Sequence, residues 1–207
     1  MSRGKFITLE GGEGVGKSTQ VKALADALRH RGIDVLVTRE PGGSEGGERI
    51  RELLLAGADE RWGPRAEVLL FAAARADHVE KTIGPALESG RWVLSDRFVD
   101  SSLAYQGGAG GLGIEAVRSI NVAAVGDFFP DRTLVLAADD GSERARARDH
   151  GTSDRIGGRP DDYHRKVDAA FQIIAAEEPE RVRLIDASGS KEQVTRRLLD
   201  AIADLLP

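Results

Sequence analysis

Short apolar segments alternate along this chain with longer amphipathic ones. Five of the short segments are rich in aliphatic and β-branched residues and are bounded by polar residues or glycine, which is typical of buried strands. They are residues 6–9, 35–37, 92–94, 133–136 and 182–185. Because segments of helical periodicity separate them, the pattern predicts parallel strands joined by right-handed crossovers. We therefore expect a three-layer α/β domain built on a five-stranded parallel sheet flanked by helices.

The longer segments repeat their apolar residues at the 3.6-residue period of an α-helix. The first covers residues 21–28, and Gly32 provides a C-terminal stop. A longer helix begins at Pro64 and runs towards Leu87, and Pro85 is expected to bend or break it. Further helices are predicted over residues 114–125, 161–177 and 191–206.

Three segments fit neither pattern and are predicted as loops. Residues 41–47 and 107–113 are glycine-rich, and residues 149–160 are mostly polar or glycine. Each follows the C-terminal end of a strand or helix, near the rim where open α/β sheets bind ligands. Glycine-rich loops are usually permissive connectors, but three of them on one rim favour functional mobility around a binding site.

Composition and charge narrow the function. Of the 207 residues 41% are hydrophobic and 30% charged, which suits one soluble domain over residues 1–207. The net charge of −5 argues against nucleic acid as the main partner, although a local basic site for a small phosphate is compatible with it. The absence of cysteine excludes disulfides, thiolate zinc sites and cysteine nucleophiles. No signal peptide or membrane-spanning run is recognisable, so we expect a cytoplasmic protein.

Residues 11–18 fit the phosphate-binding pattern G-x-x-x-x-G-K-[ST], known as the P-loop. The motif follows a predicted strand and opens a predicted helix, so its glycines would let backbone N–H groups surround phosphate oxygens at the helix N-terminus. Lys17 would bridge the β- and γ-phosphates of ATP, and the Ser18 hydroxyl would bind Mg²⁺. The predicted nucleotide site comprises Gly11, Gly12, Glu13, Gly14, Val15, Gly16, Lys17, Ser18 and Thr19.

A P-loop alone does not select a reaction, since kinases, ATPases and GTPases share it. The sequence has no Asn-Lys-x-Asp guanine-reading motif, which argues against a GTPase. An ATPase would place an acidic residue at the end of an apolar strand, and Asp96 meets that requirement. Arg97 follows at once, however, and an arginine at a strand end near the P-loop indicates a second anion. A nucleotide-gated switch that recruits a protein remains the alternative from another class.

The remaining motifs, in their order along the chain, resemble the thymidylate kinase family, and within it the bacterial type that carries its catalytic arginine in the lid. After the P-loop they are TREPGG at 38–43, SDRF at 95–98, SSLAYQG at 101–107, PDRT at 130–133, and RARAR at 144–148 with DRI at 154–156. The resemblance covers essentially the whole chain. It implies a P-loop kinase fold with a short lid at about residues 144–160, phosphorylation of dTMP by ATP for dTTP synthesis, Mg²⁺ as the cofactor, and a homodimer. A kinase for another nucleoside monophosphate, or for a deoxynucleoside, is the neighbouring alternative.

By this resemblance Phe71 stacks on the thymine ring and Arg75 hydrogen-bonds a base oxygen. The two residues are four apart on a predicted helix and share a face. Taken without the resemblance, the same spacing favours Phe71 in the core beside Val68 and Leu69, and Arg75 on the solvated face. Arg97 is similar to the family arginine that grips the dTMP phosphate, because a guanidinium binds phosphate oxygens bidentately.

The resemblance adds further residues to the acceptor site. The ring of Tyr105 would pack against C2′ and exclude a ribose hydroxyl, with an ordinary core position as the alternative. Pro41 follows either a cis peptide bond or a trans bond in a rigid turn, and the sequence does not decide between them. Together with Tyr105 and Pro41, the residues expected around the monophosphate and sugar are Arg39, Glu40, Ser102 and Gln106.

Two acidic residues complete the predicted chemistry. Asp96 would hold Mg²⁺ through water, and capping of the next segment is its alternative role. Glu13 occupies a P-loop position that is neutral or basic in many proteins, and the resemblance puts it among the catalytic residues, beside the acceptor sugar or the metal. Since the attacking phosphate oxygen is already ionised at pH 7, Glu13 is interpreted as a positioning group rather than a base.

The predicted lid carries three arginines before its loop. Arg144 and Arg148 are four apart and face one way on a helix, whereas Arg146 points to the opposite side and is interpreted as solvated. The resemblance gives Arg144 a contact with ATP and gives Arg148 the catalytic contact with the transferring phosphoryl group. Residues 157–159 are Gly-Gly-Arg where the family has acidic residues, and either aspartate at 161–162 could replace them.

Overall fold

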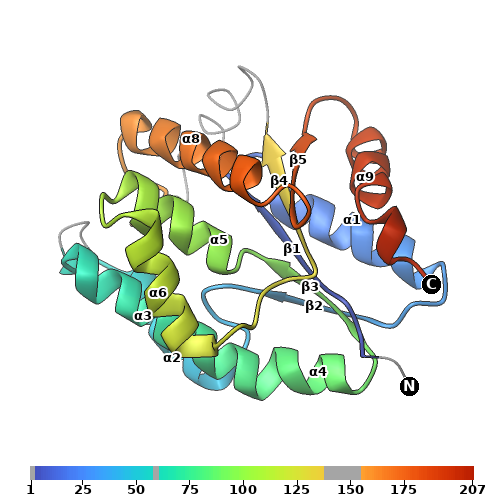
Figure 1. Ribbon diagram of the computed structural model, residues 1–207, viewed down its shortest axis with the longest axis horizontal. Helices are drawn as coiled ribbons and strands as arrows, with labels where there is room; N and C mark the ends of the chain where they lie inside the picture. Colours follow the sequence, from blue (N-terminus) through green and yellow to red (C-terminus); the bar gives the residue numbers. More distant parts are fainter. Residues whose placement is uncertain (1–2, 58–60, 138–154) are drawn as a thin grey trace.

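A five-stranded, fully parallel sheet forms the centre of the molecule (Figure 1). The computed structural model describes residues 3–57, 61–137 and 155–207. Its strands run in the order β2-β3-β1-β4-β5, and each hydrogen-bonded pair of neighbours is parallel. All five predicted strands are confirmed: β1 (Phe6–Gly11), β2 (Val35–Arg39), β3 (Trp92–Asp96), β4 (Arg132–Ala137) and β5 (Val182–Asp186).

Helices cover both faces of the sheet and create two separate hydrophobic clusters (Figure 1). On one face, Ile7 and Leu9 of β1 pack with α1 (Lys17–Arg29) and α9 (Lys191–Asp200). On the other face, Phe6 packs in a cluster with α3 (Pro64–His78), α5 (Val99–Ser102), α6 (Ile114–Val125) and α8 (Asp161–Glu177). Because both faces are covered, β1 is buried along its whole length, and the predicted three-layer α/β fold is confirmed.

The helix that starts at Pro64 changes its pitch before it ends. After α3 it passes through a π-helical turn, η2 (Val79–Ile83), in which the Gly84 N–H bonds to the carbonyl of Val79, and then continues as α4 (Gly84–Glu88). A proline lacks the N–H of a regular helix, and its ring crowds the carbonyl four residues earlier. The wider turn just before Pro85 accommodates the ring, so the helix is altered rather than broken there.

The predicted loop over residues 41–47 is wrong in its second half. Residues 45–47 form the first turn of α2 (Glu45–Leu55), which packs against α3. Ser44 caps the helix, since its hydroxyl accepts a hydrogen bond of 3.1 Å from the Gly47 N–H. Glu45 and Glu48 add negative charge to the first turn, where the helix dipole favours it. This N-terminal chemistry outweighs the low helix propensity of the two glycines.

The predicted loop over residues 107–113 is also wrong in part, because α5 continues as a π-helical segment, η3 (Leu103–Ala109). A Cβ added to Gly108 would lie 2.5 Å from the Cβ of Ala170 on α8, so only glycine permits this close approach. The last helix is shorter than predicted: α9 ends at Asp200 and a 3₁₀ turn, η4 (Ala203–Leu205), follows. Of the third predicted loop, residues 155–160 form a turn, and the remainder lies outside the described residues.

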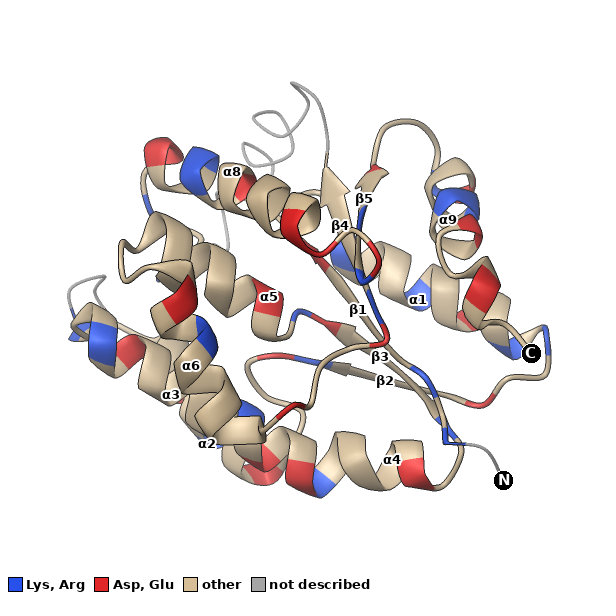
Figure 2. Ribbon diagram, in the orientation of Figure 1, with Lys and Arg blue, Asp and Glu red and all other residues tan. Residues whose placement is uncertain are grey.

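Charged side chains are spread over the outer helices. Acidic and basic residues are interspersed along α8 and α9 (Figure 2). Among the helices that the structure describes, none is both long and apolar enough to cross a membrane. Of the predicted site arginines, Arg39, Arg75 and Arg97 lie among the described residues, and they border a cleft at the ends of the strands.

Candidate active site

The P-loop connects β1 to α1 and owes its shape to glycine. Gly11, Gly14 and Gly16 have φ angles of 127°, 73° and 91°, a backbone region that other residues rarely adopt. Helix α1 begins at Lys17, and its N-cap Gly16 supplies no side-chain cap. The first N–H groups of α1 therefore remain for a ligand anion rather than for a capping side chain.

The side chain of Lys17 folds over the P-loop and contacts its backbone. Its Nζ donates to the carbonyl oxygens of Gly11 at 3.2 Å and of Gly12 at 2.5 Å, and the side chain is buried. Burial, followed by the nearby positive charge of Arg97, lowers the pKa of Lys17 to about 8. A cation that donates to uncharged carbonyls in a low-dielectric site is ready to exchange those carbonyls for phosphate oxygens.

Ser18, in the first turn of α1, lies beside Asp96, the last residue of β3. The Ser18 hydroxyl donates to a carboxylate oxygen of Asp96 at 2.8 Å. Within the described ranges no cluster of three or more histidine or acidic side chains could hold a metal on its own. One hydroxyl and one carboxylate nevertheless fit Mg²⁺, which keeps several waters and takes further oxygens from substrate phosphates.

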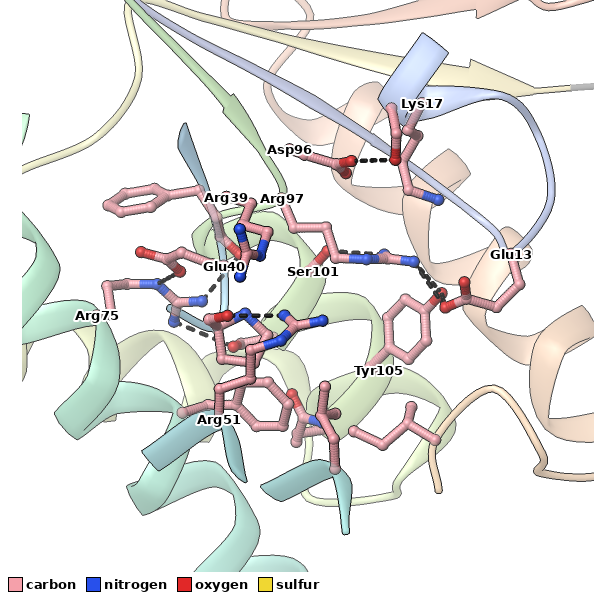
Figure 3. Close-up of a pocket in the computed structure, with 18 of the residues that line it drawn as sticks. Glu13, Lys17, Arg39, Glu40, Arg51, Arg75, Asp96, Arg97, Ser101 and Tyr105 are labelled. Carbon is pink, nitrogen blue, oxygen red and sulfur yellow. Dashed lines mark hydrogen bonds and ion pairs between the residues drawn. The ribbon is translucent and has the colours of Figure 1, made fainter. Parts of the chain in front are cut away.

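Arg97 follows β3 and extends its side chain towards the P-loop (Figure 3). Its Nη2 donates to Glu13 at 2.7 Å and to the Tyr105 hydroxyl at 3.1 Å, while Nη1 donates to the Gly11 carbonyl at 3.2 Å and to the Ser101 hydroxyl at 3.1 Å. The guanidinium therefore lies within hydrogen-bonding distance of the P-loop backbone. An anion bound at Arg97 would be close to one bound by the P-loop.

Glu13 remains ionised across the physiological pH range. Burial alone would raise its pKa, but the charges of Arg97 and Lys17 outweigh burial and lower the pKa to about 2. The Tyr105 hydroxyl also donates to Glu13, at 3.0 Å. A carboxylate with so low a pKa is a poor proton acceptor, which agrees with the interpretation of Glu13 as a positioning group.

Arg75 lies on the floor of the site and is only 1% exposed. Its Nε donates to Glu40 at 2.8 Å, Nη1 donates to Ser102 and Asn121, and Nη2 donates to the Phe98 carbonyl at 2.9 Å. The alternative that put Arg75 on the solvated face is therefore wrong. Four of its five N–H groups have partners among the described residues, which leaves one N–H on Nη2 for a ligand.

Phe71 is partly buried and lies one helical turn before Arg75. It packs against the core cluster, as the core alternative expected, and it also borders the cleft, where the base contact stays a prediction. Leu69 is 56% exposed and does not share that core position. Tyr105 resembles Phe71 in this respect, since it is 4% exposed, belongs to the same core cluster and borders the cleft.

Glu40 directly follows the last residue of β2 and contacts both Arg75 and His78. One carboxylate oxygen accepts from Arg75, and the other lies 3.0 Å from Nδ1 of the fully buried His78. Nε2 of His78 lies 2.7 Å from the Thr38 hydroxyl, so this histidine ties Glu40 to β2. The peptide bond between Glu40 and Pro41 is cis. Sequence reasoning missed His78, although its position three residues after Arg75 places both on one face of α3.

Most of the predicted site residues that the structure describes surround one cleft of about 410 Å³ at the carboxyl ends of β1, β2 and β3 (Figure 3). This volume lies in the range of small-molecule sites. Those that border it are Glu13, Gly14, Gly16, Lys17, Ser18, Thr19, Arg39, Glu40, Pro41, Phe71, Arg75, Asp96, Arg97, Ser102, Tyr105 and Gln106. Residues that the sequence analysis did not single out also border it, namely Arg51, Leu55, Phe98, Ser101 and Ile156. Gly11, Gly12 and Val15 belong to the P-loop but do not border the cleft.

The predicted lid is described only at its C-terminal end. Arg144, Arg146 and Arg148 lie outside the described residues. Arg155 and Arg159 both donate to one carboxylate oxygen of Glu67 on α3, at 2.6 and 2.7 Å. The second oxygen of Glu67 accepts from Gln106 at 3.0 Å. Glu67 thus connects this end of the lid to the wall of the cleft, and nothing in its sequence position suggested that role.

The fold and the site together define a class. A P-loop at the end of the central strand faces an arginine-rich pocket across one cleft, as in kinases that phosphorylate nucleoside monophosphates. The family model for thymidylate kinase matches residues 9–198, so the chain belongs to the thymidylate kinase family.

Known proteins match nearly the whole length of this chain in sequence and in structure. It is 59% identical to the thymidylate kinase of Rhizorhabdus wittichii over 99% of both chains. It is 49% identical to that of Bradyrhizobium diazoefficiens over 99% of this chain and 92% of the relative. The crystal structure of thymidylate kinase from Ehrlichia chaffeensis superimposes with a TM-score of 0.78 at 30% identity, covering 97% of this chain and 99% of that one.

Proposed function

We propose that this protein transfers the γ-phosphoryl group of ATP directly to dTMP, giving ADP and dTDP for dTTP synthesis. The observation that carries this proposal is the pair of phosphate-binding groups on one cleft. The P-loop with Lys17 lies on one side, and Arg97 reaches it from the other, 3.2 Å from the Gly11 carbonyl. Donor and acceptor phosphates held there would face each other, so an in-line displacement needs no covalent intermediate.

On the ATP side, Lys17 is assigned to the β- and γ-phosphates. Ser18 and Asp96 are assigned to Mg²⁺, which supplies charge neutralisation on the phosphates when it is bound. The 2.8 Å hydrogen bond between these two side chains supports the assignment, because it holds both oxygens at one place beside the P-loop. Gly11 to Thr19 provide the backbone N–H groups around the phosphates.

On the acceptor side, Arg97 is assigned to the dTMP phosphate and Arg75 to an oxygen of the thymine ring. Phe71 stacks on the base, and Arg39, Glu40, Pro41, Ser102, Tyr105 and Gln106 surround the sugar and monophosphate. Stacking contributes about 1–3 kcal/mol but does not identify a base. Recognition of the thymine methyl group depends on pocket fit alone, and one methyl-sized difference is worth only about 1–3 kcal/mol. Some activity with dUMP is therefore expected.

Arg144 and Arg148 keep their predicted roles at ATP and at the transferring phosphoryl group. An arginine that contacts the transition state of phosphoryl transfer can raise the rate about 10³- to 10⁵-fold. We also propose that residues 1–207 form a single kinase domain, with a lid at about residues 144–160, and that the protein acts in the cytoplasm.

A homodimer is proposed on a surface argument as well as on the resemblance. Leu53 on α2, Leu69 on α3 and Val122 on α6 are exposed by 42%, 56% and 39%, and α2 and α6 both pack against α3. A second copy of the chain would cover these side chains. Sedimentation of the purified protein, alone and with Leu69→Glu, tests this: a dimer that becomes a monomer in the variant supports the interface.

The proposed reaction is tested by ADP release in a coupled assay with ATP and Mg²⁺. Separate reactions contain dTMP, dUMP, dGMP, dCMP, AMP, thymidine or no acceptor. We expect strong turnover with dTMP, weaker turnover with dUMP, and background rates for the others. Preference for another acceptor would contradict the roles of Phe71, Arg75 and Tyr105, whereas hydrolysis of ATP without any acceptor would favour an ATPase.

Tyr105 should contribute two separable effects. Its ring is assigned to the exclusion of a 2′-hydroxyl, and its own hydroxyl holds Glu13 and Arg97. Tyr105→Phe is therefore expected to lower kcat about 5- to 100-fold, the combined worth of these two hydrogen bonds, while the preference for dUMP over UMP is retained. Tyr105→Ala should lose that preference as well. The measurement is kcat/KM for dUMP and UMP in both variants. An unchanged preference in Tyr105→Ala would contradict the assignment of the ring.

A further inference from the structure

Arg97 has an unusual backbone conformation for an arginine that binds substrate. Its φ angle is 71°, the only positive value at a residue other than glycine in the described part of the chain. Side chains crowd the backbone in this left-handed region, so surrounding contacts must hold the residue there. The backbone of Arg97 has two such contacts: its N–H donates to the Leu9 carbonyl at 3.0 Å, and its carbonyl accepts from the Ser95 hydroxyl at 2.7 Å.

A third contact comes from the buried side chain of Glu10, near the end of β1. One carboxyl oxygen accepts from the N–H of Phe98, the residue after Arg97, at 2.7 Å. The other oxygen lies 2.5 Å from the Ser101 hydroxyl. Glu10 is 0% exposed and does not border the cleft, so it has no direct contact with a substrate there.

Ser101 relays this contact to the guanidinium of Arg97. The Ser101 hydroxyl accepts from Nη1 of Arg97 at 3.1 Å and is bonded to Glu10 on its other side. Glu10 therefore acts on Arg97 twice, through the backbone at Phe98 and through the side chain at Ser101. Both connections link the central strand β1 to Arg97, the residue assigned to the dTMP phosphate.

Other charged groups surround Glu10 and determine its protonation. Asp100 of α5 repels a negative charge on Glu10, Arg97 attracts one, and Lys17 of α1 is close enough to be influenced by it. Burial, followed by Asp100, raises the pKa of Glu10 to about 8. Burial thus disfavours the charged form of Glu10, and a neutral side chain of the same shape can also make its two hydrogen bonds.

We propose that Glu10 is a positioning residue for phosphoryl transfer, which holds Arg97 in its left-handed conformation and aims the guanidinium at the acceptor phosphate through Ser101 and the Phe98 N–H. This inference rests on the proposed function, because it takes Arg97 as the group that binds the dTMP phosphate. The role concerns geometry rather than charge. A neutral side chain of the same shape should therefore serve, and a side chain without oxygen atoms should not.

The test compares Glu10→Gln with Glu10→Ala. Glutamine can accept from the Phe98 N–H and donate to Ser101, whose hydroxyl oxygen can still accept from Arg97. Thr8→Val is the matched control: Thr8 is also buried on β1, and the variant loses its hydrogen bond to Thr133 without touching Arg97. For each protein, kcat, KM for dTMP, KM for ATP and the melting temperature are measured.

We expect Glu10→Ala to lower kcat/KM for dTMP about 10- to 100-fold, the range of coupling between residues in one network, with less than a twofold change in KM for ATP. Glu10→Gln and Thr8→Val should stay within about threefold of the wild type. Equal increases in both KM values, or a loss in Glu10→Gln as large as in Glu10→Ala, would overturn the proposal. If Glu10→Ala does not fold, Ser101→Ala removes one of the two connections at a partly exposed position, and it is expected to show a smaller loss with the same selectivity for dTMP over ATP.

A double-mutant cycle separates this inference from the proposed function. The dissociation constant for dTMP is measured by calorimetry for the wild type, Glu10→Ala, Arg97→Ala and the double variant. We expect Glu10→Ala to weaken binding in the wild type but to have less than a twofold effect once Arg97 is absent. Additive effects would overturn the role of Glu10 and leave Arg97 in place. No effect of Arg97→Ala itself would overturn the role of Arg97 in the proposed function, and that of Glu10 with it.

Discussion

Lys17→Ala is expected to abolish turnover while the protein remains folded. Among the described residues this ammonium group bonds to two P-loop carbonyls, and in the proposed reaction it would move onto the β- and γ-phosphates. Loss of one preorganised group that stabilises transition-state charge costs about 10²- to 10³-fold in kcat. The protein should remain folded, because Lys17 is a buried cation whose charged form is disfavoured. Burial and the nearby charge of Arg97 both lower the pKa of Lys17, so its removal relieves an unfavourable charge.

The measurement is single-turnover formation of dTDP, together with thermal unfolding. Lys22→Ala is the matched control, since Lys22 lies on the same helix but is exposed. That variant should keep full activity. Turnover of Lys17→Ala at more than a tenth of the wild-type rate would contradict the assignment of Lys17 to the transferring phosphates.

Arg75→Ala should damage both substrate binding and stability. A hydrogen bond from a charged group to a base oxygen contributes about 1.5–3 kcal/mol, so KM for dTMP should rise about 10- to 100-fold, with a much smaller change in KM for ATP. The variant also leaves the buried carboxylate of Glu40 without its 2.8 Å ion pair. Breaking a buried pair costs about 3–5 kcal/mol, and the melting temperature should fall by about 10 °C.

Arg75→Lys separates these two effects. A lysine keeps a positive charge beside Glu40 but cannot also reach Ser102, Asn121 and the Phe98 carbonyl. We therefore expect it to recover much of the stability and little of the dTMP affinity. Arg65→Ala, at an exposed position of the same helix, is the control and should change neither quantity. Equal increases of KM for dTMP and ATP in Arg75→Ala would contradict the base-pocket assignment.

The sequence predicted the sheet well because buried parallel strands leave a strong pattern. Every strand of a sheet covered on both faces must be apolar, and the covered strands β1 and β3 stand out for that reason. The P-loop was equally recognisable, since its glycines and Lys17 meet a geometric requirement that few other residues satisfy. The helices that were missed carry weaker signals. Gly46 and Gly47 have low helix propensity, so the start of α2 was predicted as a loop. Arg51, which lies on α2 and borders the cleft, was missed for the same reason.

The acceptor side depends on contacts that no local pattern contains. The position of Arg75 depends on Glu40, which is 35 residues away along the chain, and that of Arg97 on Glu13, which is 84 residues away. Spacing on one helix could therefore not decide whether Arg75 faces solvent or the cleft, and taken alone it favoured the wrong answer. Only the resemblance to a family predicted that Arg75 lines a base pocket. The tertiary contacts of Arg75 then explain why it is buried.

The two hydrophobic clusters on opposite faces of the sheet support different parts of the cleft. The cluster that contains Leu24 and Leu28 supports α1 and hence the P-loop, whereas the cluster that contains Val68, Leu103 and Val117 supports the helices around the proposed acceptor site. In the proposed reaction the first cluster therefore supports the ATP side and the second supports the acceptor side, and the Arg97–Glu13 ion pair is one of the contacts between the two sides. Substitutions in the second cluster are thus expected to change which nucleotide is accepted while the affinity for ATP stays the same.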